Sequence, residues 1–163
     1  TIKNEYPAFG GNYQVIHHTQ LINELVGAGK ISMNLEGDNM KVTFHDPCYL
    51  GRHNKITDAP RDDLKSAGIE VVEMPRNGAK SFCCGAGGAQ MWKEEENGTA
   101  RVNEARFAEA KSILLSAAGP SAGAGTVAVG CPFCLTMMSD ASKADGGNIQ
   151  VKDVAEIVAE RMK

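Results

Sequence analysis

The sequence predicts an α/β fold with a mostly parallel sheet of about five strands and a cysteine site at the carboxyl ends of the strands. Three observations support this prediction. Segments of strand length alternate about five times with segments of helical periodicity, a pattern typical of a parallel sheet covered by helices. The segment 126–129 is apolar throughout, as expected of a strand buried on both faces. The cysteines follow predicted strands, and open α/β sheets form their sites beyond the carboxyl ends of strands.

The composition indicates one globular domain in a reducing compartment. The 163 residues are enough for a single domain with a core. The net charge of −3 gives no support for nucleic-acid binding, which favours a clustered basic surface. No apolar run approaches the roughly 20 residues of a membrane-spanning helix, so no membrane segment is expected within this chain. Five cysteines, two of them adjacent, fit thiolates reserved for metal or redox chemistry better than a disulfide framework.

The first half of the chain is predicted to hold three strands and two helices after an irregular start. The strands are expected at 13–17, 41–45 and 69–74, and the helices at 19–27 and 58–67. Thr19 and Asp58 are the expected N-caps, because their side chains can accept hydrogen bonds from the first free amides. Gly27 and Gly68 are expected to end the two helices.

The second half is predicted to hold three helices and two strands. The helices are expected at 99–117, 132–143 and 153–162, and the strands at 126–129 and 148–151. Pro132 would occupy the first helical position, where its missing N–H costs nothing. A loop rich in glycine and alanine is expected at 119–125. The apolar side of the longest helix is predicted to consist of Val102, Ala105, Ala108, Ile113 and Leu114.

The start of the chain resembles its end. The segment 10–15, Gly-Gly-Asn-Tyr-Gln-Val, parallels 146–151, Gly-Gly-Asn-Ile-Gln-Val, and the similarity continues for about another turn of helix. We infer a duplication of a whole domain, in which a similar Cys-x-x-Cys once preceded Thr1. Residues 1–12 are therefore interpreted as the tail of a preceding repeat or a linker, and residues 13–163 as a cysteine-rich domain.

The cysteines fall into three groups with distinct chemistry. Cys131-Pro-Phe-Cys134 stands at a predicted helix start, where first-turn amides and the helix dipole stabilise thiolates. Cys83 and Cys84 are adjacent, and on a regular strand their side chains would point to opposite faces. To act together they need a bent backbone, a freedom that glycines supply. The glycines that follow the pair are Gly85, Gly87 and Gly88.

Several chemistries fit these groups. Five thiolates exceed the four ligands of a tetrahedral zinc site, whereas a cluster of several irons can use more sulfur. An iron–sulfur cluster for electron transfer is the favoured interpretation. One alternative is a structural zinc domain that docks a partner. Another is a metal-free dithiol/disulfide reductase that works through Cys131 and Cys134. His45 is the histidine best placed to join the site, because it stands three residues before Cys48.

Three motifs carry a resemblance to a known family. They are His-Asp-Pro-Cys-Tyr-Leu-Gly-Arg at 45–52, Phe-Cys-Cys-Gly-Ala-Gly-Gly at 82–88 and Cys-Pro-Phe-Cys-Leu-Thr at 131–136. Together they resemble the CCG cysteine-rich domain of the heterodisulfide-reductase-like iron–sulfur oxidoreductases, where it occurs in the B-type and D-type catalytic subunits. Members of this family usually carry two such domains, often after a ferredoxin-like domain. Here only one motif is complete, so the isolated chain would be half of an active site that needs two.

The resemblance implies a [4Fe–4S] cluster, which is non-cubane in the heterodisulfide reductases, with zinc as the alternative in some members. The implied ligands are Cys48, Cys83, Cys84, Cys131 and Cys134. His45 and the backbone of Gly85, Gly87 and Gly88 are the expected donors to cluster sulfurs.

The resemblance also implies partners and a place in the cell. The chain would pass electrons between a partner cluster or flavin and a disulfide, quinone or carrier. The expected partners are upstream CCG and ferredoxin-like domains of the same parent chain, together with a flavoprotein or iron–sulfur electron donor. The expected location is the cytoplasm, either free or at the cytoplasmic face of a membrane through the parent protein.

Overall fold

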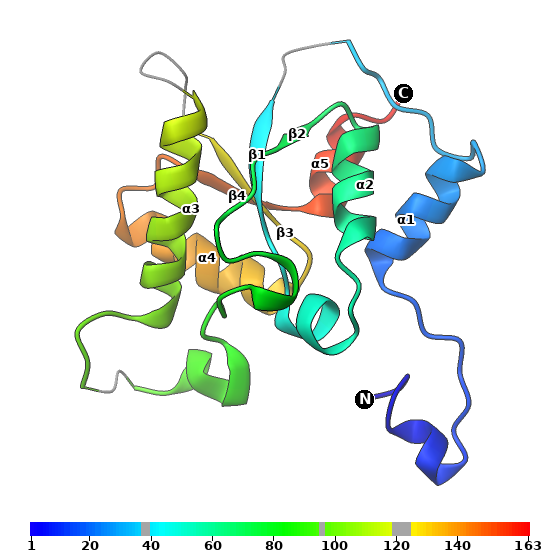
Figure 1. Cartoon of the computed structure of the whole chain (residues 1–163), viewed down its shortest axis with the longest axis horizontal. Coiled ribbons are helices and arrows are strands. Elements are labelled where there is room, and N and C mark those ends of the chain that lie inside the picture. The colour runs from blue at the N-terminus through cyan, green and yellow to red at the C-terminus, as the bar shows by residue number, and fades with distance from the viewer. Residues whose placement is uncertain (37–39, 95–96, 119–124) are drawn as a thin grey trace.

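The computed structural model describes residues 1–36, 40–94, 97–118 and 125–163, and within them the chain forms an α/β fold around a parallel sheet. All pairs of neighbouring strands are parallel, in the order β2-β1-β3-β4 (Figure 1). The strands are β1 (Lys41–His45), β2 (Glu70–Val71), β3 (Thr126–Val129) and β4 (Gln150–Asp153). The predicted fold class is confirmed, with four strands rather than about five in the described residues.

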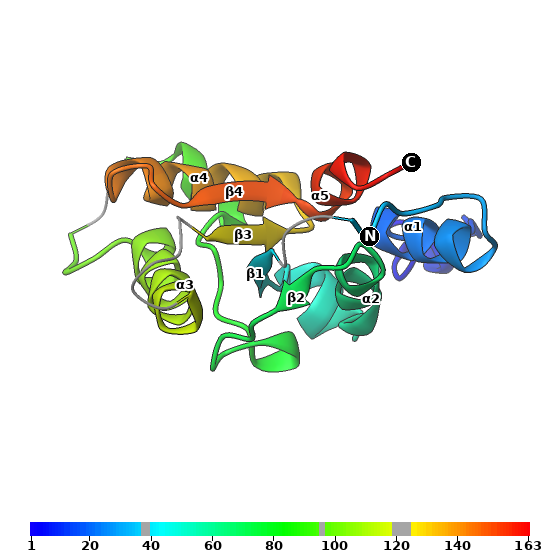
Figure 2. The ribbon, with the colours of Figure 1, turned by 90° about the horizontal axis from the view of Figure 1, so that it is seen from above.

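Helices cover both faces of the sheet. They are α1 (His18–Gly27), α2 (Asp58–Ser66), α3 (Val102–Ala118), α4 (Pro132–Ala144) and α5 (Val154–Glu160). Helices α3 and α4 pack on one face, and α2 and α5 pack on the other (Figure 2). Helix α1 lies outside this layer against α2 and α5. None of the described helices is both long enough and apolar enough to cross a membrane.

The strand expected at 13–17 is absent. Residues 13–16 are extended but pair with no described strand, and Tyr13 is 66% exposed. The reason is tertiary, because the segment leads into α1, which lies outside the helical layer and away from the edges of the sheet. His17, expected to close that strand, is instead the N-cap of α1, a place predicted for Thr19.

The other element boundaries follow the prediction with small shifts. Thr57 rather than Asp58 is the N-cap of α2, whereas Pro132 opens α4 as expected. The strand expected at 69–74 is reduced to β2, and the loop expected at 119–125 lies largely outside the described residues. Asp153 caps α5 through a capping box with Glu156.

The buried side of α3 differs from the predicted apolar side. Val102, Ala105 and Ala108 are exposed, and Leu114 is buried as expected. The buried residues of this helix are Asn103, Arg106, Phe107, Ala110 and Leu114. Their spacing of three or four residues is helical, but two of them are polar, so a pattern based on hydrophobicity assigned the wrong face.

Asp63 is a fully buried carboxyl group of α2, which packs against α1. Among the described residues, neither of its carboxylate oxygens meets a donor at good hydrogen-bonding geometry. Burial raises its pKa from 3.8 to about 7, and the nearby Asn23 amide and His18 offset burial only in part. Asp62 adds a smaller effect that raises the pKa further.

We therefore expect Asp63 to make stability depend on pH. Its folded pKa of about 7 exceeds the unfolded value of 3.8, so the folded chain binds more protons between these values. The contribution of Asp63 to the free energy of unfolding falls as pH rises through this window, by on the order of 3 kcal/mol. Denaturant unfolding of Asp63→Asn should show a gain over the parent chain at pH 8 that is absent at pH 4. The control is Asp62→Asn, which changes the exposed neighbouring carboxylate. If the free energy of unfolding depends on pH in the same way for the parent chain and Asp63→Asn, this account is wrong.

Candidate metal centre at the carboxyl ends of the strands

The topology creates a site between the ends of β1 and β3. From β1 the chain first moves to β2 on one side and later returns to β3 on the other side. Ligand sites of open α/β sheets form at such a reversal of strand order. His45 at the end of β1 lies beside Val129 at the end of β3. Cys48 and Cys131 follow these two strands directly.

Asp46 holds the turn that carries Cys48. Its carboxylate accepts hydrogen bonds from Arg61 Nη1 at 2.8 Å and Nη2 at 3.0 Å, and from the Gly78 N–H at 2.7 Å. Its carbonyl oxygen accepts from Ser81 Oγ at 3.1 Å. The turn after β1 is thereby fixed both to α2 and to the loop that leads to the adjacent cysteines.

The loop of the adjacent cysteines bends as the sequence requires. Gly85 has a φ of 89°, a left-handed conformation that favours glycine. Its N–H donates to Cys83 Sγ at 3.3 Å. A side chain at Gly85 would also press on Val102, since a Cβ there would lie 3.0 Å from the Val102 Cβ. Gly85 thus allows both the bend and the close approach of α3.

The third group of thiols stands at the N-terminus of α4. Cys131 is the N-cap residue, and Pro132 occupies the first turn. The backbone N–H groups of Phe133 and Cys134 favour the charged form of the Cys131 thiol and lower its pKa. Cys134 is buried, whereas Cys131 is half-buried. The free amides of a helix start therefore stabilise a thiolate at Cys131.

The structure brings the five free thiols into one electrostatic group. Cys134 Sγ lies 3.4 Å from Cys84 Sγ, and Cys134 also interacts electrostatically with Cys131. Cys48 interacts with both Cys83 and Cys84. Only Cys84, Cys134 and His45 have donor atoms within 4.8 Å of one another among the described residues. Soft sulfur donors of this kind suit iron–sulfur clusters or zinc.

The thiols differ in how easily they lose a proton. Hydrogen bonds from Cys134 and from backbone amides outweigh burial and lower the pKa of Cys131 to about 6. A hydrogen bond from Cys134 also lowers the pKa of Cys84, with further help from His45 and the Ala86 amide. The pKa of Cys134 is raised by its thiol neighbours Cys131 and Cys84 and by burial. Burial raises the pKa of Cys48.

His45 is buried beside the Cys84 sulfur, and its Nδ1 accepts a hydrogen bond at 3.0 Å from Nε of Arg106. A guanidinium has no acceptor, so Nδ1 must be unprotonated and neutral His45 carries its hydrogen on Nε2. In this form His45 offers no free lone pair to a metal. Its one remaining hydrogen, on Nε2, is available for donation, and the expected role of His45 as a donor to cluster sulfurs stays a prediction.

Arg106, Asp46, Arg61 and Ala86 contribute to the site but were not among the expected site residues. Asp46 belongs to the motif at 45–52, so its position two residues before Cys48 could have identified it as a site residue. Arg106 gave no signal, because it lies far from the cysteine motifs in the sequence and reaches the site only through His45. Gly87 and Gly88 are exposed, and their expected role as donors stays a prediction.

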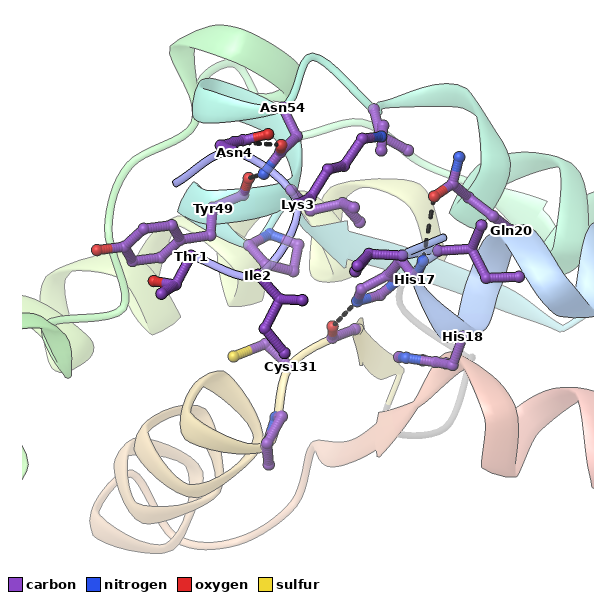
Figure 3. A pocket seen from close by; sticks show the side chains of 17 residues that line it. Thr1, Ile2, Lys3, Asn4, His17, His18, Gln20, Tyr49, Asn54 and Cys131 are labelled. Atoms are coloured by element: carbon purple, nitrogen blue, oxygen red, sulfur yellow. Dashed lines mark hydrogen bonds between the residues drawn. The ribbon is translucent and has the colours of Figure 1, made fainter. Parts of the chain in front are cut away.

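A cavity of about 490 Å³ opens on Cys131 (Figure 3). It lies between the N-terminal segment, the turn after β1 and the start of α4. Its lining is mainly apolar, with Ile2, Ile16 and Leu50 among its residues, and His17 and His18 stand at one side. His17 Nε2 donates to the Gly130 carbonyl at 3.0 Å, which ties α1 to the residue before Cys131.

The fold and the site define a cysteine-rich α/β domain whose thiols gather where the strand order reverses. Residues 42–139 match the CCG family, described as a cysteine-rich domain. The chain belongs to this family. The matched residues include all five cysteines and run from β1 into α4.

Curated relatives extend the similarity over nearly the whole chain. The chain is 45% identical to the probable iron-sulfur-binding oxidoreductase FadF of Bacillus subtilis, over 97% of this chain and 21% of that protein. It is 40% identical to the EtfAB:quinone oxidoreductase of Syntrophomonas wolfei, over 99% of this chain and 22% of that protein. It is 36% identical to the D-type subunit of the dihydromethanophenazine:CoB–CoM heterodisulfide reductase of Methanosarcina barkeri, over 92% and 34%. No solved structure gives a significant match.

These relatives are named as an iron–sulfur-binding oxidoreductase, a quinone oxidoreductase and a heterodisulfide reductase subunit. The chain spans about a fifth to a third of their length. Such proteins therefore contain further domains beside the one described here.

Proposed function

We propose that this chain is an iron–sulfur electron-transfer domain of a heterodisulfide-reductase-like oxidoreductase. The observation that carries the proposal is the group of five thiols at the switch point between β1 and β3, with Cys84 and Cys134 Sγ atoms 3.4 Å apart. We assign a [4Fe–4S] cluster, non-cubane as in the heterodisulfide reductases. Its ligands would be Cys48, Cys83, Cys84, Cys131 and Cys134. When bound, the cluster supplies reversible one-electron transfer.

The chain's own residues prepare this site. The α4 start stabilises a thiolate at Cys131 before any metal binds, and the Gly85 amide donates a hydrogen bond to Cys83 Sγ. Asp46 and its partners hold the Cys48 turn against the loop of the adjacent cysteines. The buried position of Cys84 and Cys134 excludes water from one side of the site, which strengthens hydrogen bonds to sulfur there.

The acceptor would reach the site through the cavity beside Cys131. Its apolar lining suits an uncharged disulfide, quinone or small carrier, and quinone appears in the name of the Syntrophomonas wolfei relative. Electrons would come from a partner cluster or flavin of a further domain or protein. Upstream CCG and ferredoxin-like domains would be parts of the same parent, with residues 1–12 as the tail of the preceding repeat. We place the protein in the cytoplasm, at the membrane face when the acceptor is a quinone.

Iron, acid-labile sulfide and zinc content measured after purification without oxygen tests the proposal. We expect about four irons and four sulfides per chain, with an EPR signal that changes on reduction. Zinc without sulfide would contradict the electron-transfer function and would indicate a structural or docking domain. No metal, even after anaerobic reconstitution, would contradict a cluster held by this chain.

A dithiol reductase is the second candidate, and the lowered pKa of Cys131 favours it. Cys131 is half-buried at a helix start and stands three residues before Cys134, an arrangement that suits attack on a disulfide. Reduction of a model disulfide by metal-free protein, abolished in Cys131→Ser while the fold persists, would support this candidate. The same variant should lose metal under the first proposal.

A further inference from the structure

Arg106 is a buried cation at the centre of the α3 face that covers the site. Its side chain is completely buried, and its pKa is lowered by that burial. Nε donates to His45 Nδ1 at 3.0 Å, and Nη1 donates to the Arg76 carbonyl at 2.9 Å and to Glu109 Oε2 at 3.1 Å. Nη2 has no partner among the described residues. A buried charge is costly unless it is paired, so its position calls for an explanation.

The contacts of Arg106 fix it in one orientation. Glu109, only 12% exposed, receives hydrogen bonds from both Arg106 and Arg76. The guanidinium is planar and offers donors in a fixed fork, so holding Nη1 also fixes the direction of Nε. In this orientation Nε points at His45 Nδ1. A chain of contacts thus runs from the surface pair Arg76–Glu109 through Arg106 to His45 and on to Cys84.

We propose that Arg106 is a positioning residue that fixes His45 in the tautomer with hydrogen on Nε2, so that His45 donates to the Cys84 sulfur and favours the reduced state of the site. The first part concerns the chain alone. The second part rests on the proposed function, because it needs a redox centre bound to Cys84. A nearby cation and an N–H···S hydrogen bond both stabilise added negative charge.

The alternatives for His45 conflict with this geometry. The tautomer with hydrogen on Nδ1 would set two donors against each other at 3.0 Å. An imidazolium would do the same and would place a second positive charge beside the buried guanidinium. Both cost free energy because His45 and Arg106 are buried, and a buried donor left unpaired is not compensated. Neutral His45 with hydrogen on Nε2 satisfies Arg106 and leaves its only donor for sulfur.

The tautomer can be measured in metal-free protein by long-range ¹H–¹⁵N NMR of the histidine rings. We expect the Nε2-protonated form for His45 in the parent chain and its loss in Arg106→Met, where Nδ1 has no donor. The control is Lys111→Gln, which removes a partly exposed cation from the same helix. If the parent chain itself shows His45 protonated on Nδ1 or positively charged, the proposal is wrong. This measurement needs no variant, so the proposal remains testable even if Arg106→Met fails to fold.

The second readout is the midpoint potential of loaded protein, from an EPR-monitored redox titration. Arg106→Met should lower it, with the ratio of reduced to oxidised centres falling about tenfold at fixed potential, or 59 mV for one electron. Arg106→Lys keeps the charge but loses the planar fork and should recover only part of the shift. A midpoint equal to that of Lys111→Gln would overturn the redox part. If the chain binds no redox centre, the proposed function and the redox part both fail, while the NMR result still decides the role of Arg106 in the free protein.

Discussion

Cys84→Ser is expected to abolish assembly of the iron–sulfur centre, the largest functional effect of any single substitution at the site. Cys84 lies at the middle of the site, since its sulfur is 3.4 Å from that of Cys134 and also lies beside His45. A serine hydroxyl is a hard donor that remains protonated and suits iron–sulfur chemistry poorly. Loss of an outer-shell partner typically costs 10–100-fold in metal affinity, so loss of a central ligand should cost at least roughly tenfold.

The measurement is iron and sulfide per chain in protein reconstituted without oxygen. Ala79→Ser is the matched control, because it places a serine at an exposed position of the loop that leads to the adjacent cysteines, without removing a thiol. Thermal unfolding of both metal-free variants separates loss of the site from loss of the fold. If Cys84→Ser binds as much iron and sulfide as the parent chain, Cys84 is not a ligand, and the ligands must come from the other four cysteines.

The sequence predicted those parts of the fold that local patterns determine. The two central strands, 41–45 and 126–129, are correct to the residue, because both are short segments rich in β-branched or aromatic residues and both are followed by turn residues. The cysteines were expected to gather at the carboxyl edge on topological grounds, and the order of strands places Cys48 and Cys131 there. The proline at the start of α4 marked its boundary for a local steric reason.

The errors occur where partners distant in sequence decide the outcome. The segment 13–16 alternates like a strand, but no neighbouring strand is available to pair with it among the described residues. Arg106 and Asn103 turn inward on α3, where His45 and the Met137 carbonyl each accept a hydrogen bond from them. A prediction from hydrophobic periodicity places every charged residue on the exposed side of a helix. It therefore assigned the wrong side of α3 to the core and missed Arg106, which contacts the site. Buried polar groups are visible only once the tertiary partners are known.

Arg61→Met is expected to lower the free energy of unfolding by about 3–5 kcal/mol, the largest effect on stability. Arg61 binds the Asp46 carboxylate with two donors and Glu73 with two more, at 2.6–3.0 Å. The Asp46 side chain is only 1% exposed. Without Arg61 its charge would be buried with the Gly78 amide as its remaining donor. These contacts also raise the pKa of Arg61 against the effect of burial, so Arg61 stays charged at neutral pH.

The loss should also reach the site, because Asp46 holds both the Cys48 turn and the loop before Cys83. Denaturant unfolding of the metal-free protein measures stability, and metal content at a temperature where both proteins are folded measures the site. Lys65→Met removes an exposed cation from the same helix and should change stability by no more than about 0.5 kcal/mol. Asp46→Asn with Arg61→Met should recover part of the loss, since it removes the orphaned charge. If Arg61→Met alone is as stable as Lys65→Met, then water reaches Asp46 in solution and the Arg61–Asp46 pair does not hold the turn.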